Sequence, residues 1–525
     1  MACTLSRASR RVRALGALLA VLCCVLGPSA AVSRAEDPPG GGPGGAGGGG
    51  GRGGGREGGA REGGGRGGGG GGARGAQGEF QFWSEVPAHD LDVVLGVPTR
   101  EGVIVSVRAL VDLEGCVAYG PVGGPSRRTD MQSFPAGKAV ELRLSGLAPG
   151  TAHVLVPLTR RTPSDGLEPG ASMRFVTGRP RGTPFTFTVQ ADSHLDHPMA
   201  PVLYDRSLRA ASTSRPDFHV DLGDTFMVDK HGKDFRASRA LFEAQRWWFS
   251  RVGVPVFLVQ GNHDGEAGSR DRGQPGDMPR WSRALREELF PQPPPDPSLV
   301  VPLGDLPPFP AQAYAFEWGD AQVIVLDPFA PTRPARGRVQ DGWDWTLGPE
   351  QHAWLARTLA SSEARIRFVF IHHLVGGLTR EGRGGAEAAR LYEWGGHDPD
   401  GTRSFEQRRP GWGTPVHELL QRHGPAVVLH GHDHFYAHQQ ADGVTYQMPP
   451  QPSNPGGNAQ RNAQEYGYRQ GTFLDGPGFM RVQVGASAAR LEYVRVPTRE
   501  AEGAAPEVVH AYDVPLGPVR TPAAR

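Results

Sequence analysis

From Pro184 onward the chain alternates short apolar stretches with polar loops and helical stretches. Short apolar runs bounded by turn-forming residues predict buried strands, and strands that alternate with helices predict an α/β fold. In the stretch 350–360, Trp354, Leu355 and Leu359 share one face of the expected helix. We therefore expect an α/β sandwich around mixed sheets. The predicted strands are 185–190, 218–222, 256–260, 323–326, 368–371, 427–429, 479–484 and 491–496. Two segments are expected to be inserted loops, 265–310 and 448–474.

Side chains that can bind metal ions follow five of these strands directly. Because α/β folds build their sites at the carboxyl ends of strands, we expect these side chains to converge. They are Asp192 and His194, Asp224, Asn262 with His263 and Asp264, His372 with His373, and His430, His432 and His434. Carboxylate, amide oxygen and imidazole together suit Mn, Fe or Zn. Their number suits two ions better than one, since a carboxylate can bridge. The glycines at 223, 261 and 431 are expected to let the backbone turn sharply beneath them.

Each of these residues alone has a plain structural interpretation. Asp224 could be a turn residue, and a single histidine such as His372 is more often hydrogen-bonded in a core than bound to a metal. Only the ordered set makes that interpretation untenable. We interpret His373 and His430 as neighbours that support the ligands.

The order Asp192-x-His194, Gly223-Asp224, Gly261-Asn262-His263-Asp264, Val369-x-x-His372 and Gly431-His432-x-His434 resembles the calcineurin-like metallophosphoesterase family, which includes the purple acid phosphatases. The resemblance extends over roughly residues 183–496 and includes all five motifs in order. It implies an enzyme that hydrolyses phosphate mono- or diesters by a metal-bridged hydroxide at a dinuclear site. The two divalent ions would be Mn, Fe or Zn.

The resemblance also implies a role for each matching residue. One ion would be held by Asp192, His194, Asp224 and His434, and the other by Asp224, Asn262, His372 and His432. Asp224 would bridge the two ions, while His263 would act on the substrate as a catalytic residue without binding metal. Met227 stands where purple acid phosphatases place a metal-bound tyrosine, so the ligand set resembles the non-purple branch.

Upstream of this region the pattern is entirely β. Residues 79–180 contain alternating or apolar stretches separated by Gly and Pro turns, which predicts a small β-sandwich. The segment from Leu144 to Thr151 and the strands that follow resemble a fibronectin type III-like domain. His153 stands where that family usually has a corner tyrosine. The expected fold class is therefore a two-sheet α/β sandwich domain over residues 183–500, preceded by this all-β sandwich.

The two ends of the chain carry different signals. Residues 1–31 have an arginine-rich start, an apolar run and small residues near Ala31, the layout of a secretory signal peptide. The apolar run is too short to span a bilayer, so we expect export to the periplasm or the extracellular space without a transmembrane anchor. Residues 32–78 are mostly glycine with arginine, which predicts a disordered linker. Residues 501–525 are expected to be a C-terminal tail. Cys116 is the one cysteine after residue 31, so no intrachain disulfide is expected.

An exported metal-dependent phosphoesterase is thus the predicted function. A net formal charge of +1 gives no reason to expect nucleic acid as a partner. The alternative is a non-catalytic surface or binding protein that uses the phosphoesterase fold as a scaffold. Degenerate scaffolds would be expected to lack Asp224, Asn262 or His263, all of which are present. The sequence leaves the substrate-binding residues and the oligomeric state open. For the mouth of the site it suggests Tyr392, Glu393, Trp394 and Trp412.

Overall fold

The computed structural model describes residues 81–231, 234–265, 277–303, 306–332, 339–498 and 504–519. The predicted signal peptide and linker, residues 1–78, lie outside these ranges. Within them, no helix combines the length and the apolar character that crossing a membrane requires.

Residues 91–176 form two antiparallel β-sheets. The first has the order β1-β2-β6 and the second β4-β3-β7-β8, with β5 paired to β3 and β9 to β7. Apolar side chains from both sheets, among them Val105 and Leu155, meet in a shared core. The all-β sandwich expected before the α/β region is therefore present. Its strands are β1 (Leu91–Thr99), β2 (Gly102–Ala109), β3 (Leu113–Pro121), β4 (Arg127–Arg128), β5 (Gln132–Phe134), β6 (Ala139–Leu144), β7 (Ala152–Arg160), β8 (Glu168–Pro169) and β9 (Met173–Val176).

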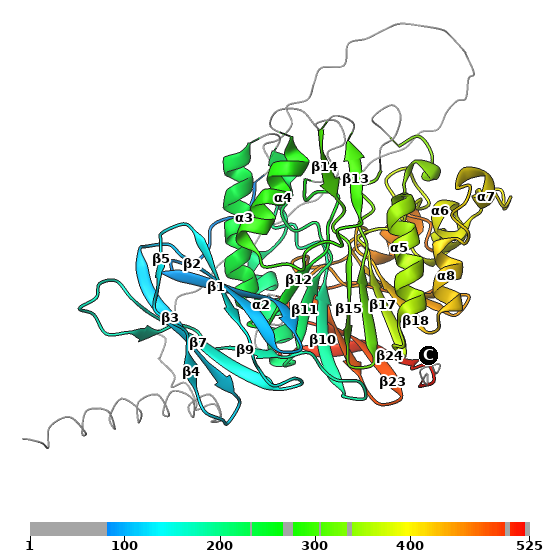
Figure 1. Ribbon diagram of the computed structural model, residues 1–525. Coiled ribbons are helices and arrows are strands. Elements are labelled where there is room, and N and C mark those ends of the chain that lie inside the picture. The colour runs from blue at the N-terminus through cyan, green and yellow to red at the C-terminus, as the bar shows by residue number, and fades with distance from the viewer. Residues whose placement is uncertain are drawn as a thin grey trace, which may run out of the picture. The chain divides into compact units, whose positions relative to one another are not determined.

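The α/β region contains a six-stranded and a seven-stranded sheet (Figure 1). The first has the order β12-β11-β10-β22-β23-β24, in which β10, β11 and β12 are parallel. The second has the order β15-β16-β17-β18-β20-β19-β21, in which β16, β17, β18 and β20 are parallel. The strands of the first are β10 (Phe185–Gln190), β11 (Phe218–Asp221), β12 (Val256–Leu258), β22 (Gly478–Val484), β23 (Ala488–Arg495) and β24 (Glu507–Pro515). Those of the second are β15 (Tyr314–Trp318), β16 (Ala321–Val325), β17 (Ile366–Phe370), β18 (Ala426–Leu429), β19 (Tyr436–Ala441), β20 (Val444–Met448) and β21 (Thr472–Leu474).

Alternation along the central strands builds a core on each face of the seven-stranded sheet. On β17, Phe368 and Phe370 pack with residues of the six-stranded sheet such as Phe187, whereas Val369 packs with Leu355 of a helix on the other face. Successive side chains of a strand point to opposite faces, so a strand that is apolar throughout must be covered on both. The predicted mixed α/β fold class is confirmed.

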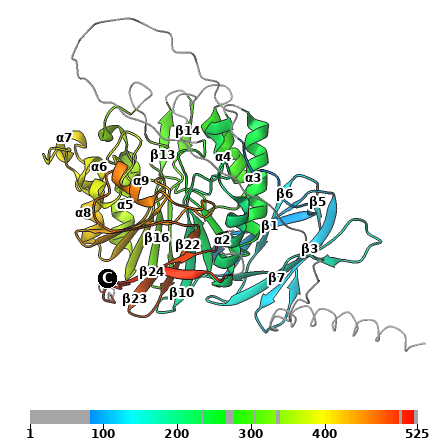
Figure 2. The same cartoon turned by 180° about the vertical axis from the view of Figure 1, so that it is seen from behind.

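Helices lie outside the sheets, as both views show (Figures 1 and 2). Asp234 caps the N-terminus of α3 by accepting hydrogen bonds from the backbone N–H groups of Arg236 and Ala237. The α-helices are α2 (Pro201–Thr213), α3 (Phe235–Ser250), α4 (Met278–Leu289), α5 (Gly348–Ser361), α6 (Tyr392–Gly395), α7 (Phe405–Arg408), α8 (Val416–Arg422) and α9 (Ala459–Glu465). The 3₁₀ turns are η2 (Val228–His231), η3 (Gly342–Asp344) and η4 (Ala386–Arg390).

Three predicted irregular segments contain regular structure. The C-terminal tail expected from residue 501 includes β24, which pairs with β23 along nearly its whole length. The segment 265–310 contains α4 and the hairpin of β13 (Val300–Leu303) and β14 (Leu306–Pro310), and 448–474 contains α9 and β21. Strand β24 also contacts His438 of β19 and Gln447 of β20, and local sequence patterns do not reveal such distant contacts.

Candidate metal centre

The side chains predicted to bind metal come together where β10, β11, β12, β17 and β18 end. Two groups could each hold an ion, and Asp224 belongs to both. The first group is Asp192, His194, Asp224 and His434, and the second is Asp224, His372 and His432, with ligand atoms within 4.8 Å of one another in each. The amide oxygen of Asn262 lies 3.1 Å from His372 Nε2, which brings it to the second group. All seven predicted ligands are thus gathered at one place.

The geometry of the two groups fits divalent ions. His372 Nε2 lies 3.3 Å from Asp224 Oδ2, and His434 Nε2 lies 3.5 Å from Asp192 Oδ1. Atoms that share one ion at about 2.0–2.2 Å are roughly 3–3.5 Å apart in a tetrahedral arrangement. His194 Nε2, Asp224 Oδ2 and His432 Nε2 are buried and have no hydrogen-bond partner among the described residues. A buried polar atom without a partner is costly, and metal coordination would satisfy all three.

The backbone that carries these ligands is held in an unusual conformation. Asp192, His194, Asp224, His432 and His434 all have positive φ angles, between 52° and 77°. Residues other than glycine rarely adopt this region, and such residues concentrate at functional sites. The surrounding fold therefore enforces the positions of these five side chains.

The glycines beside the ligands act in two different ways. Gly223 has a φ of 92°, so it provides the sharp turn that the sequence suggested. Gly261 and Gly431 have no such angle and are needed for close approach instead. A Cβ atom at Gly431 would lie 2.7 Å from Asp192 Oδ2, and one at Gly261 would collide with the backbone of Asp224. The expectation of a sharp turn was therefore wrong for these two positions.

Carboxylates and imidazoles in the centre shift each other's pKa values. Burial lowers the pKa of His194, but Asp196, Asp224 and Asp192 outweigh it and raise that pKa to about 10. Burial also lowers the pKa of His372, but Asp224 and Asp192 raise it to about 9. Burial would raise the pKa of Asp224, yet His372 and His263 hold it well below its usual range. Imidazole binds a metal ion in its neutral form, so a metal ion that bound here would displace protons from these histidines.

His263 lies beside the two groups and has a partner that sequence reasoning missed. Its Nδ1 lies 2.9 Å from both carboxylate oxygens of Asp229 in η2. Its ring centroid is 5.9 Å from that of His194, and its side chain is partly exposed. A carboxylate on Nδ1 fixes the imidazole so that Nε2 is the free nitrogen. Asp229 follows Asp224 by five residues, and nothing in its spacing distinguished it from an ordinary surface acid.

Asp264 also has a role that the motif did not reveal. Its buried carboxylate accepts hydrogen bonds from the backbone N–H groups of Gly261, Asp224, Thr225 and Phe226. It therefore fastens the loop after β12 to the loop after β11.

Residues expected near the centre divide into two kinds. His373 and His430 are buried, and the ring of His373 lies 5.2 Å from that of His432, consistent with a supporting role. Glu393 and Trp394, however, are fully buried in the structure, where Trp394 Nε1 donates to Tyr446 and Glu393 pairs with Arg409. The suggestion that these two line the mouth of the site was therefore wrong.

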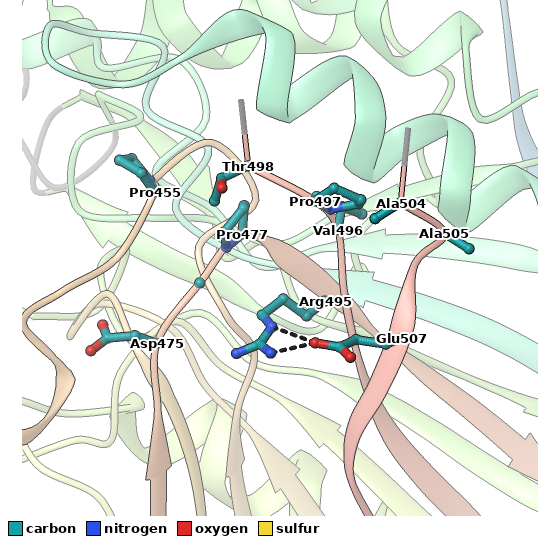
Figure 3. A pocket seen from close by; sticks show the side chains of 11 residues that line it. Pro455, Asp475, Pro477, Arg495, Val496, Pro497, Thr498, Ala504, Ala505 and Glu507 are labelled. Carbon is teal, nitrogen blue, oxygen red and sulfur yellow. Dashed lines mark hydrogen bonds and ion pairs between the residues drawn. The ribbon is translucent and has the colours of Figure 1, made fainter. Parts of the chain in front are cut away.

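A hollow of about 400 Å³ lies elsewhere in the α/β region (Figure 3). Arg495 and Glu507 form an ion pair across it, and Pro477 and Val496 are among its walls. None of the residues that line it belongs to the two metal-binding groups. It is therefore separate from the candidate metal centre.

Comparisons with known proteins agree with this architecture. The family model of the calcineurin-like phosphoesterases matches residues 185–436. Among solved structures, PhoD is similar with a TM-score of 0.56 and 16% sequence identity, covering 81% of this chain and 90% of that one. A purple acid phosphatase, PPD1 from yellow lupin (Lupinus luteus) seeds, is similar with a TM-score of 0.52 and 12% identity, covering 83% of this chain and 78% of that one. No curated protein matches the sequence significantly.

The matched residues 185–436 run from the first residue of β10 to the first residue of β19 and include every side chain of the two metal-binding groups. At these low identities the solved structures support the fold alone. The family match identifies residues 185–436 as a calcineurin-like phosphoesterase domain, and the solved structures agree with it in fold.

Proposed function

We propose that this chain hydrolyses phosphate mono- or diesters at a dinuclear metal centre. The observation that supports this most strongly is that the two groups share Asp224 and contain buried atoms that no described residue hydrogen-bonds. Membership of a phosphoesterase family supports the same class of reaction. One ion would be held by Asp192, His194, Asp224 and His434, and the other by Asp224, Asn262, His372 and His432. Mn, Fe and Zn all suit these donors.

When bound, two such ions activate a water molecule as a nucleophile and neutralise negative charge on the phosphate. The chain's own residues would supply orientation and a proton. Asp229 holds Nδ1 of His263, which leaves Nε2 to hydrogen-bond the phosphate or to protonate the leaving oxygen. General acid catalysis of this kind contributes roughly 10²- to 10⁴-fold to the rate.

The experiment that tests this proposal is hydrolysis of p-nitrophenyl phosphate and bis(p-nitrophenyl) phosphate. The chain would be stripped of metal and refilled with Mn, Fe, Zn or Mg. We expect turnover that requires metal, that is abolished in Asp224→Asn and that falls by roughly 10²- to 10⁴-fold in His263→Ala. The ratio of the kcat/KM values for the two substrates shows whether the chain prefers monoesters or diesters.

Two matched variants serve as controls. Asp400→Asn and His397→Ala change residues of the same types outside both groups, and both should keep wild-type turnover. If the wild-type chain binds none of these metals and cleaves neither ester, the chain is a non-catalytic scaffold.

We also propose that the chain is exported, on the basis of the signal-peptide layout of residues 1–31. The N-terminus of the mature protein can be determined by mass spectrometry after cell fractionation. We expect a chain that begins at Val32 in the periplasmic or extracellular fraction. A full-length chain confined to the cytoplasm would contradict export.

A further inference from the structure

Helix α3 carries two parallel stripes of buried residues that face different parts of the molecule. Leu241, Gln245 and Trp248 form one stripe, and Phe242, Arg246 and Phe249 form the other. Residues at positions i, i+4 and i+7 lie on one face of a helix, so adjacent stripes can contact two different partners. Both views show α3 beside β1 of the sandwich (Figures 1 and 2).

The stripe around Arg246 contacts the β-sandwich. The guanidinium of Arg246 is fully buried and bonds to Asp92 of β1, to Oγ and O of Ser106 of β2, and to the backbone oxygen of Leu289. Val94 of β1 packs in the same apolar cluster as Phe242 and Phe249. The contact between sandwich and helix is therefore a buried ion pair within an apolar surface.

The acidic and basic side chains in this contact stabilise each other's charged forms. Burial would raise the pKa of Asp92, but Arg246, with His89 and Arg108, holds it below its usual range. Arg108 of β2 also pairs with Glu243 of α3, at 2.9 Å. Separating the partners of a buried ion pair leaves an uncompensated charge, so the pair of Asp92 and Arg246 favours the observed placement of β1 on α3.

The stripe around Gln245 contacts the loops that carry the ligands. Gln245 Nε2 donates to Oγ of Ser193, which lies between Asp192 and His194, and to the backbone oxygen of Thr225, which follows Asp224. Its Oε1 accepts from Tyr204 Oη. Leu241 and Trp248 pack with Leu195 and Met227, the apolar neighbours of the same ligands. One side chain thus bridges two ligand loops.

The stacking of Phe226 on Phe242 joins the two stripes. The rings are 3.9 Å apart and nearly parallel, and Phe226 follows Asp224 by two residues. A shift of α3 relative to the sandwich would therefore move the loop of Asp224 through Phe226 as well as through Gln245. The sandwich and the α/β region belong to one compact unit.

We propose that the β-sandwich is a positioning element of the metal centre and acts through α3. Asp92 and Ser106 hold Arg246, the helix holds Gln245 and Phe242, and these hold the loops of Asp192 and Asp224. Arg246 and Gln245 are positioning residues that touch neither ion nor substrate. This inference rests on the proposed metal site.

The test measures binding of Mn²⁺ to the full chain by calorimetry, with the paramagnetic resonance spectrum of the bound ion as a second readout. The double variant Asp92→Asn/Arg246→Met removes the ion pair without leaving an isolated buried charge. We expect it to weaken Mn²⁺ binding by about tenfold, the lower end of what outer contacts of metal ligands contribute, and to alter the spectrum. Ser106→Ala, which removes one hydrogen bond to Arg246, should weaken binding by a smaller factor.

Leu155→Ala is the matched control, because Leu155 lies in the sandwich core on β7 and makes no part of the contact with α3. Leu155→Ala should lower the melting temperature and leave Mn²⁺ affinity unchanged.

If the double variant and Leu155→Ala both bind Mn²⁺ as the wild type does, the inference is overturned and the sandwich contributes stability alone. If the double variant does not fold, Ser106→Ala decides: unchanged affinity overturns the inference. A wild-type chain that binds no Mn²⁺ refutes the proposed site itself, and the inference with it.

Discussion

Asp264 is a residue at which stability and activity should change together. Each of its carboxylate oxygens accepts two backbone N–H groups. In Asp264→Asn the amide nitrogen would face two of these donors and leave them buried without acceptors. We expect a loss of roughly 2–6 kcal/mol in the free energy of unfolding, at about 1–3 kcal/mol for each of the two unsatisfied groups. The kcat/KM of the proposed phosphate-ester hydrolysis should fall by roughly 10- to 100-fold.

Urea unfolding and steady-state kinetics measure these two effects. Asp475→Asn is the control, because Asp475 also accepts backbone N–H groups, from Asn458 and Ala459, but belongs to neither metal-binding group. It should lose stability and keep its kcat/KM. Activity of Asp264→Asn within twofold of the wild type would show that Asp264 does not position the ligands.

The sequence predicted a single residue's role only where few residue types can perform that role. Few side chains bind metal, so Asp192 or His432 at a strand end was recognisable in advance. The role of Asp229 could not be predicted, because its carboxylate contacts His263 only in the folded chain, where η2 places it there. The left-handed backbone conformation of Asp192 and Asp224 could not be predicted either, because the surrounding fold imposes it.

Among the elements, β24 joins the two sheets more closely than its place at the end of the chain suggests. The ring of Tyr512 stacks on His438 of β19 at 3.6 Å, and its hydroxyl donates to Gln447 of β20. Tyr512→Ala should therefore lower the free energy of unfolding by about 2–3 kcal/mol, at the low end for a large-to-small change because the ring is not fully buried.

Thermal and urea unfolding test this prediction. Val508→Ala is a suitable control on the same strand, since Val508 is 44% exposed and such changes usually cost less than about 0.5 kcal/mol. Equal stability of the two variants would mean that β24 contributes little to joining the sheets.

The central strands were predictable because they are apolar on both faces. The expected strand 185–190 coincides with β10, and the strands expected near β11, β17 and β18 are shifted by at most two residues. Strand β24 has mixed polarity, and α9 is only two turns long. Strand β24 also depends on its contacts with β19 and β20, and α9 on packing against Phe435 and Met448, so their local patterns were uninformative.

For the whole molecule, the buried histidines make stability depend on pH. His219 on β11 is completely buried, and its Nδ1 lies 2.8 Å from Thr188 Oγ1. Burial lowers the pKa of His219 to about 3. The unfolded chain, with an imidazole pKa of about 6.5, therefore binds more protons than the folded chain between these values. The stability that neutral His219 contributes is complete above pH 6.5 and is lost as the pH falls toward 3.

The size of this effect can be measured on the metal-free chain, in which metal binding adds no pH dependence. At pH 5 the linkage of a single group with these pKa values amounts to about 2 kcal/mol relative to pH 7. His219→Gln removes the titrating group, so the difference between the free energies of unfolding at pH 7 and pH 5 should shrink by about that amount. Urea unfolding at the two pH values measures it, and His397→Gln at a partly exposed position is the control. An unchanged difference in His219→Gln would mean that the acid sensitivity of the fold arises at other buried groups, and that a charge is tolerated on the face of β11 that points away from the core between the two sheets.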